Sequence, residues 1–204
     1  MPHHAEIVSF DDSPPPPGAN PWVVTGDGPG TGIKVTDPDP AWPRQYDRLA
    51  GRIRQALGWR VLQLEHVGST AVPGLAAKPV IDIDLTVADP GRERDYVPAL
   101  ESAGFRLTIR EPWWHGHRML RADEPSCNLH VFGFDSPELV KHRIFRDWLR
   151  ATPASVTAAP PQNARPRRRR MWPASTSCTT TSASSRSSAG STTRAFAAAG
   201  LLEP

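Results

Sequence analysis

The amino-acid sequence predicts an α+β (mixed α/β) fold, in which helices flank a small mixed sheet. Two hydrophobic patterns carry this prediction. Residues 79–87, PVIDIDLTV, alternate side chains with the two-residue period of a strand. Residues 43–57 place apolar side chains at helical spacing between charged ones. Both patterns recur along the chain in the order helix, strand, strand, helix, three strands and helix, which is typical of helices packed on one small sheet.

The helices are predicted from three amphipathic segments. In residues 43–57 the apolar side chains are Tyr46, Leu49, Ala50, Ile53 and Leu57. A second helix is expected over residues 91–103, with Tyr96, Val97 and Leu100 on its apolar face. The last helix is expected over residues 136–150, because Ser136 suits the N-cap position and Pro137 suits the first helical position.

The remaining strands are predicted from shorter alternating runs. Residues 61–67, VLQLEHV, precede the 79–87 strand. Residues 105–110, 117–120 and 127–132 follow it, separated by turns that contain proline. We therefore expect five strands, with the 79–87 strand the most strongly patterned.

Composition separates a central domain, residues 35–153, from both ends of the chain. Residues 1–34 contain PPPP and GDGPGTGIK and too few apolar side chains to offset the entropy of ordering, which predicts a flexible, disordered leader. The glycine run imitates a phosphate loop. However, Val35 follows its lysine where Ser or Thr is needed, and two nearby prolines prevent a helix. We do not expect this run to bind phosphate.

The C-terminal segment, residues 154–204, contains no Asp, Glu or Lys before Glu203 and consists mainly of Ala, Ser, Thr, Arg and Pro. One interpretation is a disordered, low-complexity tail. Another is that residues 154–193 are a coding segment translated in the wrong frame, since shifting the frame restores a more ordinary composition. Residues 194–202, RAFAAAGLL, again have the pattern of a helix end.

Charge and composition limit the expected partners. Residues 151–204 carry seven arginines and one acid, a balance of +6, so the rest of the chain carries −3 of the total +3. The basic character comes from the tail, and nucleic-acid binding is not expected. No apolar run reaches membrane-spanning length, and the first residues are not a signal peptide, so we expect a cytoplasmic protein without a membrane partner. Cys127 and Cys178 lie far apart and predict neither a disulfide framework nor a zinc site.

The strand over residues 79–87 carries two acids. Because successive side chains alternate between faces, Asp82 and Asp84 share one face, and the apolar side chains of Ile81, Ile83 and Leu85 share the other. Two neighbouring carboxylates repel unless a cation or protons lie between them, and carboxylate oxygens together with substrate phosphates suit Mg²⁺. The alternative is a solvated strand face with ordinary acids.

The segment before this strand favours the metal hypothesis. Gly68 and Ser69 can turn the chain sharply and present backbone N–H groups and a hydroxyl to a phosphate. Lys78 adds a positive charge just before the acids. The order of strand, Gly-Ser turn and strand with D-x-D resembles that of nucleotidyltransferase-fold enzymes. The resemblance implies that the turn holds a nucleotide's phosphates and that Asp82 and Asp84 hold a catalytic Mg²⁺.

A closer resemblance covers residues 35–153. HVGSTAVPGLAAKPVIDIDL at 66–85 is similar to the hallmark of the GrpB family, a group of small, mostly uncharacterised proteins assigned to the nucleotidyltransferase superfamily. Four further stretches agree in order: DPDPAWP at 37–43, HR at 117–118, NLHVF at 128–132 and FRDWLR at 145–150. In actinobacterial relatives a similar domain is joined to dephospho-coenzyme A kinase, which implies nucleotide or coenzyme metabolism.

The sequence departs from an active nucleotidyltransferase in the third carboxylate. At the corresponding strand stands His130, which could bind metal, act as a base or serve a structural role. Glu65 could supply the missing charge or lie on the surface. Arg118 is the candidate phosphate ligand from the next strand, because guanidinium binds phosphate with two hydrogen bonds. Trp113 and Trp114 could stack on a base or pack in the core.

Three functional hypotheses follow. The first is metal-dependent nucleotide binding with nucleotidyl or phosphoryl transfer, carried by Asp82 and Asp84, with substrate contacts from Gly68, Ser69, Lys78, Arg118 and His130. The second is a nucleotide-binding or regulatory module without catalysis, favoured by the missing third acid. The third is a truncated or frameshifted family member that folds poorly.

Overall fold

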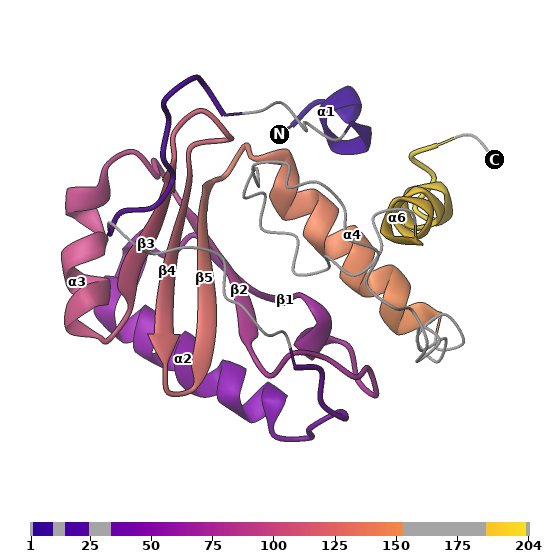
Figure 1. The fold of residues 1–204 in the computed structure, drawn as a ribbon, viewed down its shortest axis with the longest axis horizontal. Helices are drawn as coiled ribbons and strands as arrows, with labels where there is room; N and C mark the ends of the chain where they lie inside the picture. The colour runs from indigo at the N-terminus through magenta and orange to yellow at the C-terminus, as the bar shows by residue number, and fades with distance from the viewer. Residues whose placement is uncertain (1, 10–14, 25–33, 153–186, 203–204) are drawn as a thin grey trace.

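The computed structural model describes residues 2–9, 15–24, 34–152 and 187–202 (Figure 1). At its centre is a sheet of five strands in the order β1-β2-β5-β4-β3. The strands are β1 (Gln63–Val67), β2 (Ile81–Val87), β3 (Arg106–Glu111), β4 (His117–Asp123) and β5 (Ser126–Gly133). Neighbours are antiparallel except β2 and β5, which are parallel. The mixed α/β prediction is therefore confirmed, and the acid-bearing strand β2 lies inside the sheet.

Helices pack on both sides of this sheet. One face is covered by α2 (Trp42–Leu57) and by α3 (Val97–Ser102), which follows the 3₁₀ turn η3 (Glu93–Asp95). On the other side lies α4 (Pro137–Ala151), accompanied by α1 (His4–Val8) and α6 (Ser187–Ala198), as Figure 1 shows. The predicted helix over residues 91–103 is shorter than expected. Pro98, in the first turn of α3, marks where regular helix begins.

The hydrophobic core lies between the sheet and α2. Ile81, Ile83 and Leu85 are completely buried and pack with Leu49 and Ile53 of α2. The two-residue spacing in β2 and the helical spacing in α2 predicted that these side chains face the core. Burial of a branched side chain of this size contributes roughly 1.5 to 3 kcal/mol.

Part of the predicted leader extends the sheet. Trp22 forms a bridge with Ile109 at the edge of β3, the Val23 N–H donates to the Thr108 carbonyl at 3.0 Å, and the Arg110 N–H donates to the Pro21 carbonyl at 2.8 Å. Residues 21–23 of the predicted leader are therefore paired with the sheet. Unpaired backbone groups at a sheet edge accept any extended segment that reaches them, whatever its composition.

The C-terminal helix α6 includes Arg194–Ala198, where the sequence predicted a helix end. Ala195 and Phe196 are buried, and the Arg194 guanidinium lies 5.9 Å from the ring of Trp148 on α4. Most of the segment discussed as frameshifted, residues 154–186, lies outside the described residues, as do residues 26–33 of the glycine run.

Candidate functional site

The candidate site lies on the face of β2 opposite the core. Asp82 and Asp84 alternate with the buried isoleucines and therefore lie on the same face, as predicted. They are not solvated: Asp82 is 4% exposed and Asp84 1%. The alternative of an ordinary solvated strand face is therefore wrong. Burying two carboxylates is unfavourable unless they are paired, so their partners decide what the face can do.

The Gly-Ser turn lies directly against Asp82. Gly68 has a φ of +70°, in the region that favours glycine, and connects β1 to the 3₁₀ turn η2 (Ser69–Ala71). A Cβ on Gly68 would lie 2.4 Å from Asp82 Oδ2, closer than any real contact. Only glycine allows the turn to approach the carboxylate in this way. The structure thus brings together Gly68, Ser69 and the acids, and Ser69 is half-buried.

The two carboxylates have different surroundings. Asn128 Nδ2 donates to Asp82 Oδ1 at 2.9 Å, and His130 Nε2 lies 3.9 Å from the same oxygen. His142 Nδ1 donates to Asp84 Oδ2 at 2.8 Å. The other oxygen, Asp84 Oδ1, is buried without a hydrogen-bond partner among the described residues. A buried, unpartnered carboxylate oxygen is unusual, and it fits a site that receives a cation or a donor from a ligand.

A third carboxylate adjoins this pair but is already engaged. Glu65 of β1 lies opposite Asp84 in the register, and its Oε2 accepts from Arg146 Nη1 at 2.7 Å. Burial raises the pKa of Glu65, but hydrogen bonds from Arg146 and Gln63 outweigh it, so the pKa is lowered. Glu65 is thus neither free surface nor an unoccupied metal ligand.

Helix α4 closes the face with side chains that the sequence analysis missed. Glu138, His142, Arg146 and Arg150 recur every fourth residue, which places them on one stripe of the helix. Burial lowers the pKa of His142, but the Asp84 and Glu138 carboxylates outweigh it and raise the pKa. The four-residue spacing was the signal available in the sequence. The apolar side chains of the helix drew attention instead.

Two arginines of this stripe bracket the Gly-Ser turn. Arg146 Nη1 donates to the carbonyl of His66 at 3.0 Å, just before the turn. Arg150 Nη2 donates to the carbonyl of Ala71 at 2.8 Å, just after it. The turn is therefore held from both ends by guanidinium groups of α4.

Arg118 is not part of this site. It faces the opposite side of the sheet, where its Nε donates to Glu93 Oε1 at 2.6 Å. Strand alternation turns the Arg118 side chain away from the acids, so its position does not favour the predicted phosphate contact at this face. Lys78 is exposed before β2. His130 lies on the same face as the acids, opposite Asp84 in the register with β5.

One of the two tryptophans has a packing role. Trp114 packs edge-on against His117 and Phe132, with ring centroids 5.2 and 6.0 Å away. This is the packing role expected as the alternative to base stacking. Trp113 is half-buried.

Within the described part of the chain, no group of three or more His, Cys, Asp or Glu side chains is arranged to hold a metal ion. Two carboxylates remain as possible metal ligands, with Asp84 Oδ1 unpartnered among these residues. Mg²⁺ is commonly held by one or two carboxylates and completed by substrate phosphates and water. The donor set therefore fits a cation that arrives with a phosphate ligand rather than one caged by protein alone.

Comparison with known proteins identifies the family. The family model described as GrpB protein matches residues 32–158, which include the Gly-Ser turn, all five strands and α4. The chain belongs to the GrpB family. The matched residues thus include every residue of the candidate site described above.

Relatives in bacteria cover the same region. A UPF0157 protein of Halalkalibacterium halodurans is 52% identical over 119 residues, which are 58% of this chain and 61% of the relative. A UPF0157 protein of Streptomyces coelicolor is 44% identical, covering 58% of this chain and 62% of the relative. The chain thus spans about three fifths of the length of these relatives. A protein named dephospho-CoA kinase in Mycolicibacterium paratuberculosis is 33% identical over 59% of this chain and 36% of its own length.

A solved structure shares the fold. The crystal structure of the conserved protein GrpB from Enterococcus faecalis superposes with a TM-score of 0.55 at 34% identity. The match covers 61% of this chain and 76% of that chain.

No helix in the described ranges is both long and apolar enough to cross a membrane.

Proposed function

We propose that this GrpB-family chain binds a nucleotide or nucleotide-like small molecule together with Mg²⁺, and transfers a nucleotidyl or phosphoryl group. The observation that carries the proposal is the buried carboxylate face against a glycine turn. Asp82 touches the turn at Gly68, and Asp84 keeps one buried oxygen without a partner among the described residues. The fold does not need such a face for its stability, because a buried carboxylate oxygen without a hydrogen-bond partner destabilises the folded chain.

Asp82 and Asp84 would hold the metal. Both offer oxygen ligands from the same strand face, which is the chemistry that Mg²⁺ prefers. When bound, Mg²⁺ neutralises charge on the transferring phosphoryl group. The role of this chain's own residues is to hold the phosphates in place and to keep water from the buried face.

The phosphate contacts would come from the turn and from α4. Gly68 and Ser69 present backbone N–H groups at the start of η2, and a serine hydroxyl lies beside them. Arg146 and Arg150 bind backbone carbonyls on both sides of this turn, and guanidinium groups form strong paired hydrogen bonds with phosphate. Lys78, exposed ahead of β2, adds long-range attraction for an anionic ligand.

The names of the relatives narrow the substrates to test. Similarity to part of proteins named dephospho-CoA kinase supports the inclusion of coenzyme A precursors among the candidate ligands. A ligand of this kind accords with the cytoplasmic location that the sequence predicted.

A thermal-shift screen tests the proposal. The full chain is melted with nucleoside triphosphates and coenzyme A precursors, each with Mg²⁺ and with EDTA. We expect a higher melting temperature with at least one nucleotide and Mg²⁺, because ligand binding stabilises the native state. The double variant Asp82→Asn with Asp84→Asn should melt sharply and lose this shift. An equal shift in that variant would reject the metal site, and a wild-type chain without a sharp transition would support the frameshift hypothesis.

A binding module without catalysis is the second candidate. Glu65, the one carboxylate of β1, favours this candidate. Its carboxylate forms an ion pair with Arg146 and so does not serve as a third metal ligand. Nucleotide binding with Mg²⁺ but without product formation, followed by phosphorus NMR over hours, would support this function over transfer.

A further inference from the structure

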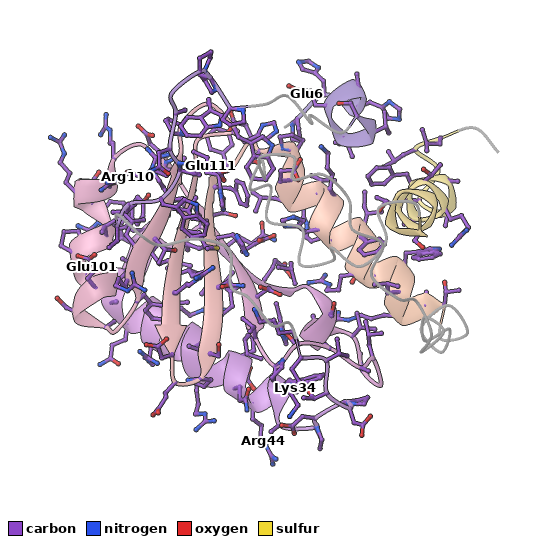
Figure 2. All side chains as sticks on the ribbon, viewed as in Figure 1. Glu6, Lys34, Arg44, Glu101, Arg110 and Glu111 are labelled. Carbon is purple, nitrogen blue, oxygen red and sulfur yellow. The ribbon has the colours of Figure 1, made fainter. Side chains whose placement is uncertain are left out.

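The Gly-Ser turn is held by a buried hydroxyl on the residue that follows it. Thr70 is 4% exposed, and its Oγ1 donates to the carbonyl of Val80, the residue just before β2, at 3.1 Å. The same oxygen lies 3.1 Å from Nε2 of His66 on β1. One hydroxyl thus connects β1, the turn and the start of β2. These segments lie at the end of the sheet near the start of α2, where Arg44 is labelled in Figure 2.

The direction of both hydrogen bonds follows from the groups that form them. A carbonyl oxygen can only accept, so the single hydrogen of the Thr70 hydroxyl is used on Val80. The hydroxyl oxygen keeps its lone pairs, and His66 Nε2 carries the hydrogen that it donates to Thr70. The reverse assignment, with Thr70 donating to His66, forms one bond instead of two and takes this donor from the carbonyl of buried Val80. A charged imidazole also carries a hydrogen on Nε2, so the direction does not depend on the charge of His66.

The imidazole that donates to Thr70 is itself fixed in place. It stacks on the ring of Tyr46 from α2, with centroids 4.8 Å apart and planes 4° apart. The Tyr46 hydroxyl donates to the carbonyl of Leu64 on β1 at 3.3 Å. Burial lowers the pKa of His66 to about 4, so the ring is neutral near pH 7. A neutral ring with its hydrogen on Nε2 is a single tautomer, Nε2–H.

The Thr70 hydroxyl matters for the site because Thr70 lies inside the turn that is proposed to bind phosphate. In the 3₁₀ turn η2 the internal bonds begin with the Ala71 N–H, which donates to the Gly68 carbonyl at 3.2 Å. The N–H groups of Ser69 and Thr70 precede this bond and are not used inside the turn. Gly68, at the start of the turn, lies directly against Asp82. Because the hydroxyl is bound on both sides, a rotation of the turn away from Asp82 breaks a buried hydrogen bond.

We propose that Thr70 is a positioning residue for the Gly-Ser turn, and that its hydroxyl, oriented by His66, fixes the turn against β2 so that Ser69 meets the phosphates of the ligand. The hydroxyl acts through the turn and does not touch the ligand. The inference rests on the proposed function for the identity of the ligand, but the hydrogen bonds themselves do not. It assigns roles to two side chains outside the metal and phosphate contacts named above.

The hydrogen bonds can be tested without a ligand. Long-range proton–nitrogen NMR on the full chain labelled with ¹⁵N-histidine reports the tautomer of His66, whose signals are identified by their loss in His66→Gln. At about pH 8, well above the pKa of about 4, we expect the Nε2–H pattern. In Thr70→Val the acceptor is lost and the Nδ1–H population should rise, whereas Thr70→Ser should keep the wild-type pattern. The Nδ1–H pattern in the wild-type chain would overturn the proposal.

The same variants test the positioning role. Each full chain is titrated calorimetrically with ATP, GTP, CTP, UTP and dephospho-coenzyme A in the presence of Mg²⁺. For a ligand that binds the wild-type chain, we expect Thr70→Val to raise the Kd by about tenfold, the equivalent of one lost hydrogen bond. Thr70→Ser keeps the hydroxyl and should restore the Kd to within about threefold of wild type. If Thr70→Val does not fold, the wild-type tautomer and the Kd of Thr70→Ser still decide the proposal.

A second buried threonine separates positioning from general stability. Thr108 on β3 is completely buried, and its Oγ1 donates to the carbonyl of Met119 at 3.1 Å, the same distance as in the bond from Thr70 to Val80. Thr108→Val should therefore lower the melting temperature as Thr70→Val does, but leave the Kd and the His66 tautomer unchanged. Equal losses of affinity in the two valine variants would contradict the positioning role.

The outcomes distinguish this inference from the proposed function. If the wild-type chain binds a ligand and Thr70→Val binds it equally well, the positioning role is rejected and the proposed function stands. If the wild-type chain binds none of the five compounds, the proposed function is rejected, and the positioning role is rejected with it.

Discussion

The two faces of β2 are buried to a similar extent, but one carries apolar side chains and the other carries carboxylates. On one face Ile81, Ile83 and Leu85 pack against α2, and the removal of these apolar side chains from water is favourable. On the other face Asp82 and Asp84 are buried to nearly the same extent under α4, where burial is unfavourable for each charge. Equal burial thus serves opposite purposes. The first face stabilises the fold, and under the proposed function the second keeps acceptors in place for a ligand.

The largest expected effect is on the apolar face. Ile83→Ala should lower the free energy of unfolding by about 4 kcal/mol, since it removes buried methyl groups and leaves a cavity. Urea unfolding followed by tryptophan fluorescence measures this loss. The comparison predicts that Asp84→Asn, at the next position on the other face, changes stability by no more than about 1 kcal/mol, because the amide oxygen can still accept from His142 Nδ1 and a buried charge is removed. Similar losses at both positions would contradict a division of roles between the faces.

A buried histidine on the α2 side predicts a loss of stability in acid. His66 stacks on Tyr46, and its Nε2 lies 3.1 Å from Thr70 Oγ1. Burial lowers its pKa from 6.5 to about 4. The unfolded chain therefore takes up a proton first as the pH falls below 6.5. Relative to His66→Gln, the wild-type chain should lose about 3 kcal/mol between pH 7 and pH 4, and it should lose nothing above pH 7. A constant difference between the two chains over this range would show that His66 is not buried as described.

A buried acid on the α4 side predicts the opposite slope. Burial raises the pKa of Glu111 from 4.5 to about 7, so its neutral form is favoured in the folded chain. As the pH rises from 4.5 to 7, the unfolded chain loses this proton first and the folded chain loses relative stability. Compared with Glu111→Gln, the wild-type chain should lose about 3 kcal/mol between pH 4 and pH 8. His66 lowers the stability of the wild-type chain toward low pH, and Glu111 lowers it toward high pH. Each variant must therefore be compared with the wild-type chain at every pH. A difference that grows toward low pH would contradict the burial of Glu111.

Substitutions at two glycines test whether the Gly-Ser turn belongs to the site. Gly68 and Gly74 both have positive φ, but a Cβ on Gly74 meets no atom within 4 Å, whereas one on Gly68 meets Asp82. Gly74→Ala should cost about 1 kcal/mol from backbone strain alone. Gly68→Ala should cost about 2 to 3 kcal/mol and abolish the nucleotide-induced thermal shift, because the turn must move away from the carboxylate. Equal costs and an intact thermal shift in both variants would separate the turn from the site.

Local pattern predicted one part of the site and not the other. The two-residue period of β2 placed Asp82 and Asp84 together, and the motif placed Gly68 near them, because these relations depend on short stretches of chain. The role of α4 depends on which face of the helix meets the sheet, which its amphipathic pattern left open. Glu111 reaches His117 only through the pairing of β3 with β4, and that pairing includes a register shift between Leu107 and Ile109. Arg118 lies on the face opposite the acids because side chains alternate along β4.

The edge of the sheet teaches a similar lesson. Composition alone suggested that residues 1–34 are flexible, yet residues 21–23 pair with β3. Backbone hydrogen bonds do not depend on side-chain pattern, so this pairing leaves little trace in the sequence.

The most direct measurement compares the unfolding of the wild-type chain and of the double variant Asp82→Asn with Asp84→Asn, each with and without Mg²⁺ and the nucleotide chosen by thermal shift. Without ligand, we expect the variant to be within about 1 kcal/mol of wild type, since the amide oxygens can still accept from Asn128 and His142 and the buried charges are removed. With ligand at about 100 times its Kd, the wild-type chain should gain about 2.7 kcal/mol and the variant nothing. A variant that is several kcal/mol less stable without ligand, and gains as much from the nucleotide as wild type, would show that the acids serve the fold and not a ligand.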